Sequence, residues 1–201
     1  MNALTRCVLL MIALLALSRF EVRGAIRATS PLSLFVRDGT QIVQVRVNQF
    51  SPEKDRLVFE VEQDIKGKTE QRSMPVVWKV NPKGKDVGVL ALPRLLKCFG
   101  PDQQAILFIN DGGKFWHNEQ RKSPISYGFI NGSWFFMDST KRDDGKLVWR
   151  LEQGEPFLRT TFKGTTAELN KVLVDHLGGK GKLPDPVKVE PGFGPEYQPK
   201  K

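Results

Sequence analysis

The chain has 201 residues, of which 31 are Lys or Arg and 22 are Asp or Glu, and its formal net charge is +9. This length suffices for one domain with a hydrophobic core. Only two cysteines are present, Cys7 and Cys98, so the composition excludes a fold held together by several disulfides.

The first segment, residues 1–24, has the layout of a secretory signal peptide. Arg6 precedes an unbroken apolar run over Cys7–Leu17, and small residues follow from Gly24. Eleven residues rise only about 16 Å as a helix, roughly half of a bilayer's hydrocarbon core, so this run is too short to span a membrane. We expect cleavage after Gly24, with Ala28 as a second option. The protein is then exported, periplasmic or extracellular, and has no transmembrane segment after signal removal.

Removal of residues 1–24 leaves 28 basic and 21 acidic residues, a net charge of +7. A positive charge can attract a polyanion such as nucleic acid, acidic polysaccharide or anionic lipid. The basic pairs are dispersed, however, and nearly all lie beside Gly, Asp or Pro: Lys66/Lys68, Lys83/Lys85, Arg121/Lys122, Lys141/Arg142 and Lys180/Lys182. We interpret these pairs as solvated turns, with a polyanion as the alternative partner.

Alternating segments dominate the first half of the body. Gln41–Asn48 and Leu57–Asp64 place an apolar residue at every second position, as a half-buried strand requires. The turn between them predicts an antiparallel hairpin. Met74–Val80 is a third predicted strand, and Pro75 places it at a sheet edge or at a strand start. Lys83–Gly88 is expected to be a loop.

Two further elements follow in the middle of the chain. Pro93–Phe99 is expected to form a short helix, with Pro93 in its first turn and Gly100 at its end. Gln104–Asn110 is apolar on both faces, which indicates a central strand.

The clearest hairpin lies between residues 125 and 138. Ile125–Ile130 and Ser133–Asp138 flank Asn131-Gly132, the favoured pair for a two-residue type I′ turn. That turn fixes the register and places four rings on one face: Tyr127, Phe129, Trp134 and Phe136.

The opposite face of this hairpin has a different character. There the register pairs Gly128 with Phe135, so that a large ring lies over a glycine.

The last third of the chain changes from strand to helix. Lys146–Glu152 alternates again, and Phe157–Phe162 is expected to add one more strand. Thr165–Leu177 has helical periodicity, a capping box formed by Thr165 and Glu168, and glycines at its end. Residues 180–201 are rich in Pro, Gly and Lys and are expected to be a flexible tail, extended or disordered.

These elements predict a mainly β fold. We expect an antiparallel curled sheet or OB-like barrel of about seven strands, with a C-terminal α-helix packed on it. A two-sheet β-sandwich is the alternative. A single β-rich domain would then cover residues 25–179 and be closed by helix 165–177.

Two stretches resemble the netrin-like (tissue-inhibitor-of-metalloprotease-like) domain, an OB-type barrel: Gln41–Lys68, a hairpin that ends in Lys-Gly-Lys, and Leu95–Asn110. Phe157–Lys180 is similar to the closing segment of exported, uncharacterised proteins from planctomycete-type bacteria. The resemblance implies the fold only. The metalloprotease inhibitors begin with a cysteine and depend on disulfides, whereas this chain without its leader retains only Cys98, so protease inhibition is not implied.

Groups for catalysis are few. The sequence holds two histidines, His117 and His176, and no His or Cys pair with the spacing of metal ligands. Cys98 is expected to be a buried, inert thiol. We therefore expect no catalytic residue, no metal and no other cofactor.

The candidate ligand-binding residues are aromatic and basic. The rings of Tyr127, Phe129, Trp134 and Phe136 either stack on bases or sugars, as in barrels of this type, or pack as core. Trp116 and His117 lie in a polar loop nearby in sequence. The basic rim of an exposed ring face would comprise Arg121, Lys122, Lys141 and Arg142.

Three functions remain open at this point. We favour a non-enzymatic exported module that binds an unknown protein or cell-envelope partner through its sheet edge or loops. The first alternative is a barrel that binds a polyanion or carbohydrate with its aromatic face and basic rim. The second is a small hydrolase-type enzyme that uses His117 with Glu119 or Asp111 as an acid–base pair.

Overall fold

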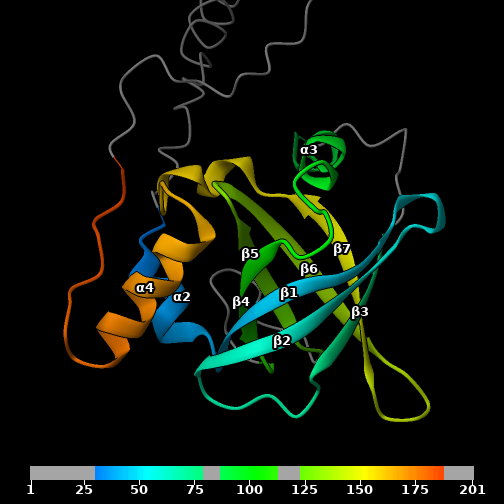
Figure 1. Cartoon of the computed structure of the whole chain (residues 1–201), viewed down its shortest axis with the longest axis horizontal. Helices are drawn as coiled ribbons and strands as arrows, with labels where there is room; N and C mark the ends of the chain where they lie inside the picture. Colours follow the sequence, from blue (N-terminus) through cyan, green and yellow to red (C-terminus); the bar gives the residue numbers. More distant parts are fainter. Residues whose placement is uncertain (1–29, 79–86, 113–122, 188–201) are drawn as a thin grey trace, which may run out of the picture.

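A computed structural model describes residues 30–78, 87–112 and 123–187 of the chain (Figure 1). Seven strands form a closed barrel in the order β1-β2-β3-β7-β6-β5-β4. Their bounds are β1 Gln41–Ser51, β2 Arg56–Lys66, β3 Ser73–Trp78, β4 Gln104–Asn110, β5 Ile125–Ile130, β6 Ser133–Lys141 and β7 Leu147–Gly154. The α-helices are α2 Leu32–Asp38, α3 Val87–Leu96 and α4 Thr166–Leu177, and the two short 3₁₀ helices are η1 Pro52–Lys54 and η2 Pro156–Thr160.

The barrel confirms the predicted fold class, a mainly β barrel with a C-terminal helix packed on it. Helix α4 packs against β2 and β4 on the outside of the barrel. The two-sheet sandwich is excluded, because each strand has a hydrogen-bonded neighbour on both sides.

The barrel is mixed and not purely antiparallel. It closes where β3 pairs with β7 in parallel, with Val76 opposite Trp149 and Trp78 opposite Leu151. All other neighbouring strands are antiparallel. Since β3 and β7 are far apart in sequence, no local turn determines this pairing, and hydrophobic alternation alone did not predict it.

The hairpin of β5 and β6 has the predicted register, with Gly128 opposite Phe135 and Phe129 opposite Trp134. Asn131 and Gly132 have positive φ angles of 42° and 85°, as a type I′ turn requires. The Asn131 backbone N–H also donates to Thr166 Oγ1 at 3.0 Å, and Asn131 Oδ1 accepts from the Thr166 N–H at 3.2 Å. The turn therefore also fixes the start of α4.

Helix α4 begins with the predicted capping box. Thr165 Oγ1 accepts from the Glu168 N–H at 3.2 Å, and the Glu168 carboxylate accepts from the Thr165 N–H at 2.7 Å. The bonds from the Thr165 backbone and then from its hydroxyl lower the pKa of Glu168 below its ordinary value. This reciprocal cap defines where the helix starts.

One hydrophobic core fills the barrel and a second lies outside it. The interior core takes the inward residues of all seven strands, and α3 plugs one end of the barrel with Leu92, Leu95 and the following Phe99. The outer core lies between the outer face of β4, β5 and β6 and the elements that cover it, α2, η2 and α4; its members include Phe35, Phe108, Phe129, Trp134, Phe162, Leu169 and Leu173. Strand β4 contributes to both cores, which confirms its prediction as a central strand.

Three elements differ from the sequence predictions. Helix α2 was not predicted at all. Helix α3 begins at Val87, so Pro93 lies inside the helix and not in its first turn. Residues 156–160 form a 3₁₀ helix where a strand over Phe157–Phe162 was expected. In each case tertiary packing decides the outcome, because each element buries apolar side chains against the barrel: Leu32 and Phe35 of α2, Leu92 and Leu95 of α3, and Leu158 of η2.

The described part of the tail, residues 180–187, is extended and returns along the molecule. His176 Nδ1 lies 3.1 Å from the Gly181 carbonyl oxygen, and the Val187 N–H donates to the Thr160 carbonyl at 2.8 Å. Leu183 packs against the outer core.

Among the described residues, no helix combines the length and the apolar character needed to cross a bilayer.

Candidate functional site

The four rings expected to form a ligand platform belong to the outer core. Phe129, Trp134 and Phe136 are at most 8% exposed, and Tyr127 is half-buried. Phe35 of α2 covers them, with ring centroids 5.1 Å from Trp134 and 5.5 Å from Tyr127. Of the two alternatives for these rings, the structure shows packing as core and not an open platform, because α2 and α4 pack over this face of the sheet.

Of the remaining predicted ligand residues, the structure describes only Lys141 and Arg142. Trp116, His117, Arg121 and Lys122 lie outside the described residues, as does Glu119. Lys141 ends β6, and Arg142 follows it; both are exposed.

The described part of the chain contains one histidine, His176, and one cysteine, Cys98, and both contact other residues of the fold. The His176 ring contacts the Gly181 carbonyl oxygen of the described tail, residues 180–187. Cys98 is half-exposed, with its Sγ 3.6 Å from Ser133 Oγ and 3.8 Å from the Arg94 carbonyl oxygen. Within the described ranges, no group of His, Cys, Asp or Glu is arranged to hold a metal ion.

A concave feature of the described residues lies at the end of the barrel opposite to α3, which we call the barrel mouth. A depression of about 610 Å³ lies there, bordered by the start of β1, the end of β4, the connection from β2 to β3 and the turn from β6 to β7. Helix α3 packs at the other end of the barrel. Mouths of β-barrels are among the places where ligand sites occur.

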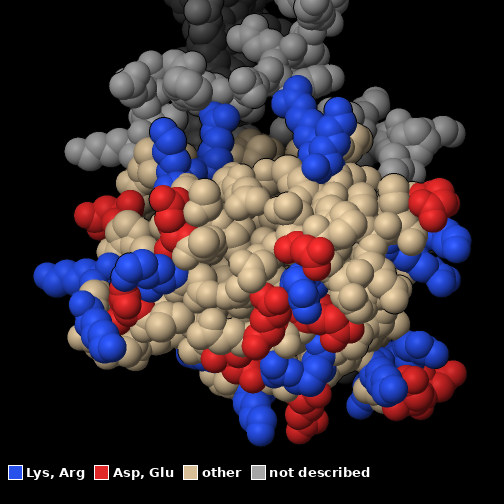
Figure 2. Space-filling view, in the orientation of Figure 1, with Lys and Arg blue, Asp and Glu red and all other residues tan. Residues whose placement is uncertain are grey.

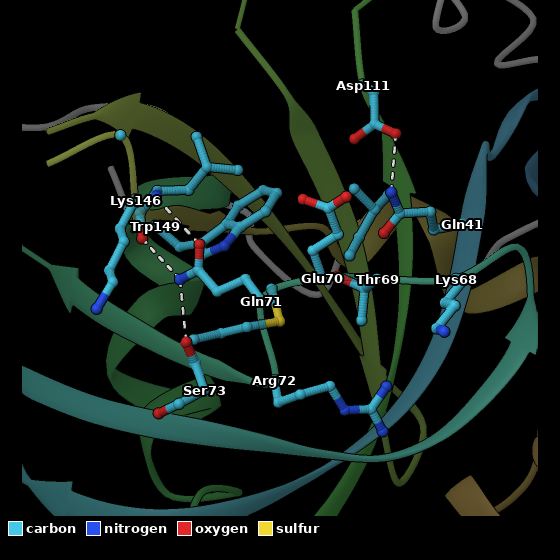
Figure 3. Close-up of a pocket in the computed structure, with 14 residues that line it drawn as sticks. Gln41, Lys68, Thr69, Glu70, Gln71, Arg72, Ser73, Asp111, Lys146 and Trp149 are labelled. Carbon is cyan, nitrogen blue, oxygen red and sulfur yellow. Dashed lines mark hydrogen bonds between the residues drawn. The ribbon is translucent and has the colours of Figure 1, made fainter.

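The mouth has an apolar floor and a polar rim. The floor consists of interior side chains that are nearly fully buried: Met74, Ile109 and Trp149. The rim carries amides, hydroxyls and charges: Gln41, Lys68, Thr69, Glu70, Gln71, Arg72, Ser73, Asp111 and Lys146. Figure 3 shows these rim side chains arranged around the depression, with Lys68 and Lys146 on opposite sides of it.

Asp111 is fixed at the end of β4 by the chain that enters β1. Its Oδ2 accepts a hydrogen bond from Gln41 Nε2 at 2.9 Å (Figure 3). It accepts a second from Thr40 Oγ1 at 3.0 Å. The Asp111 N–H donates back to Thr40 Oγ1 at 3.2 Å. Asp111, which was named as a partner for His117 in the enzyme hypothesis, thus has a defined role in closing the β1–β4 side of the rim.

Gln71 closes the opposite side, where β3 and β7 separate. Its Oε1 accepts from the Leu147 N–H at 3.0 Å, and its Nε2 donates to the Leu147 carbonyl at 2.8 Å and to the Ser73 carbonyl at 3.0 Å. A side-chain amide offers the same donor and acceptor as a backbone residue. Gln71 therefore extends the parallel ladder of β3 and β7 to the rim.

We expect Gln71→Ala to lower the free energy of unfolding by about 1–2 kcal/mol, because it leaves the Leu147 N–H and carbonyl unpaired. Urea denaturation followed by tryptophan fluorescence measures this change. Gln71→Glu should be at least as destabilising at neutral pH, because a carboxylate cannot donate to the two carbonyls. Gln49→Ala, a replacement of an exposed amide on β1, is the matched control and should have little effect. Equal stability of all three variants would contradict this role.

The charged groups of the rim divide into two classes. Arg72 is committed to the fold, since it donates to Asp64 Oδ2 at 2.7 Å and to the Val61 carbonyl at 3.1 Å. The side chains of Lys68, Glu70 and Lys146, in contrast, form no hydrogen bond or ion pair with the described part of the chain. Two cations and one carboxylate therefore remain available to a ligand over an apolar floor.

The sequence contained only part of this site. Lys66/Lys68 was recognised as a basic pair at a turn, but Gln71, Asp111 and Lys146 meet only because the barrel closes. Comparisons with protein-family models, with curated proteins and with solved structures found no match for this chain.

Proposed function

We propose that this chain is an exported, non-catalytic binding module whose partner binds at the barrel mouth. The observation that carries the proposal is the combination of an apolar floor with three uncommitted charged side chains, Lys68, Glu70 and Lys146, in one concave depression. The depression has no described histidine or cysteine on its rim, so its chemistry suits recognition.

Closure of the barrel limits the ways in which a partner can bind to the sheet. Strand addition requires an exposed sheet edge with unpaired backbone groups. Here the strands form a closed ring, and Gln71 extends the pairing where β3 and β7 separate. We therefore propose that the partner contacts the loops at the mouth and does not add a strand to a sheet edge.

We retain the netrin-like resemblance as a proposal about ancestry of the fold. The resemblance implies the fold only and carries over no ligand-binding residue, although its segments include Gln41 and Lys68 of the rim. Of these, Lys68 alone has an uncommitted charged side chain on the rim.

Site-specific photo-cross-linking in the producing cell tests the proposed mouth. A photoreactive residue replaces Lys68 in one variant and Lys54, which is exposed on η1 at the other end of the barrel, in the control. We expect a discrete adduct from position 68 that is lost when Glu70→Lys and Lys146→Glu are added. Adducts of equal yield at position 54, or no effect of the charge changes, would contradict binding at the mouth.

A further inference from the structure

The order of the uncommitted charges along the rim of the barrel mouth is set by the connection from β2 to β3. Lys68 and Glu70 belong to this connection, and the following Gln71 pairs with the backbone of Leu147, the neighbour of Lys146. Glu70 therefore lies between the two lysines along the rim, as Figure 3 shows. A ligand at the mouth meets a positive, a negative and a second positive charge in that order.

The backbone that carries the first two of these charges is held in place. Asp64 of β2 accepts a hydrogen bond from the Thr69 N–H at 3.3 Å and one from Arg72 Nη1 at 2.7 Å, on either side of Glu70. The bonds of Gln71 to β7 anchor the same connection at its far end. Binding then requires little ordering of the backbone, which favours recognition of a defined pattern of charges.

The described charges at this end of the barrel are of both signs. The described partners of Asp111 are neutral side chains, so its negative charge adds to that of Glu70. The turn from β6 to β7 adds Asp143 and the ion pair of Arg142 with Asp144 at 3.8 Å. Figure 2 shows basic and acidic side chains intermixed along the lower edge of the molecule, where this turn and the connection from β2 to β3 lie in Figure 1. A polyanion would therefore meet carboxylates as well as lysines, and like charges brought together cost free energy.

The floor of the mouth limits what an apolar ligand can gain. Met74, Ile109 and Trp149 are at most 3% exposed, so a ligand reaches little of their apolar surface. The hydrophobic contribution to binding is proportional to the apolar area removed from water, so a ligand that must bury a long acyl chain gains little here. Contacts with the polar and charged rim must therefore provide most of the recognition.

We propose that the partner at the barrel mouth is a protein segment of mixed charge, which places a Lys or Arg side chain against Glu70 and carboxylates against Lys68 and Lys146. This inference rests on the proposed function and specifies the partner of the same site. A polypeptide carries both signs within a few residues, whereas nucleic acids and acidic polysaccharides present negative charge only. Complementary charges of this kind determine which partner is accepted.

The sign of the effect of Glu70→Gln distinguishes this partner from an acidic one. A photoreactive residue replaces Ser73, an exposed and uncharged residue of the rim, in the purified chain. The chain is irradiated at increasing concentration with an extract of the producing cells, and the concentration that gives half of the maximal adduct is measured. This concentration should rise about two- to fivefold for Glu70→Gln and for Lys146→Gln, since each change removes one partly exposed ion pair. A partner with acidic groups alone would instead bind the Glu70→Gln variant more tightly.

Matched controls lie on η1, at the other end of the barrel. Glu53→Gln and Lys54→Gln remove one charge of each sign there and should leave the half-maximal concentration unchanged. Mass spectrometry of the adduct should identify a peptide that contains both basic and acidic residues close to the cross-linked position. Unchanged thermal unfolding of each variant shows that the fold is intact.

The outcomes separate this inference from the proposed function. Tighter or unchanged binding of the Glu70→Gln variant, or an adduct with nucleic acid or polysaccharide, would overturn the mixed-charge partner and leave binding at the mouth in place. Equal effects of the η1 changes would also overturn it, because the effect would then not belong to the mouth. The absence of a discrete adduct from both position 73 and position 68 would contradict the proposed function, and the inference with it.

Discussion

Gly128→Ala is expected to lower the free energy of unfolding by about 3 kcal/mol, the upper part of the range for overpacked cores. A Cβ atom at this position would lie 2.6 Å from Phe135 Cε1 and closer still to Cζ. Phe135 is fully buried and stacks among the rings of Phe59 and Phe99, so it cannot move aside without disturbing the interior core. The change is read from the midpoint of chemical denaturation.

Two controls make this prediction specific to the ring over the glycine. At Gly100 an added Cβ meets only Gln103 Cγ, at 3.7 Å, so Gly100→Ala should have little effect. Gly128→Ala combined with Phe135→Leu should lose less stability than the sum of the two single changes, because the smaller side chain relieves the clash. A wild-type midpoint for Gly128→Ala alone would show that Phe135 does not lie over position 128.

Phe35→Ala is expected to cost about 3–5 kcal/mol, as for other buried aromatic residues. Phe35 is 1% exposed, and its ring contacts Trp134, Tyr127 and Phe108 at centroid distances between 5.1 and 5.6 Å. Its removal leaves a cavity under α2 and loosens the cover of the outer core. Denaturation in urea measures the loss, and binding of a hydrophobic dye should increase.

The neighbouring Leu34 on α2 provides the matched control, because it is only half-buried. Leu34→Ala should cost far less than Phe35→Ala and should not increase dye binding. If the two variants lost the same stability, or if neither bound more dye, the four rings of β5 and β6 would be open to solvent and the aromatic-platform hypothesis would regain support.

Local signals in the sequence predicted much of the barrel. Asn131-Gly132 determines a two-residue turn, and the turn determines every pair of the β5–β6 hairpin. Thr165 and Glu168 mark the start of α4 for a similar reason, since both halves of a capping box lie within one helical turn. The apolar character of both faces of Gln104–Asn110 correctly indicated a strand with a core on each side.

The features that the sequence did not reveal depend on contacts between distant residues. No turn connects β3 directly to β7, so the sequence has no local signal for the parallel pairing of Val76 with Trp149. Helix α2 has seven residues, too few for a clear periodicity, although Leu32, Phe35 and Val36 have helical spacing. The rim of the mouth assembles Gln71 with Leu147 and Gln41 with Asp111, and each pair is separated by some seventy residues. Only the closed barrel brings these side chains together, so the sequence alone did not group them into one site.

Closure of the barrel between β3 and β7 is the claim on which the mouth depends, and a designed disulfide tests it most directly. Val77 and Arg150 are opposite each other in this parallel pair, and both alternate with inward residues, so their side chains point outward. In a chain whose own cysteines are replaced by serine, Val77→Cys with Arg150→Cys should form a disulfide on mild oxidation, because adjacent strands lie about 4.8 Å apart. Val77→Cys with Glu152→Cys should not. Free thiols in both variants would contradict a closed barrel.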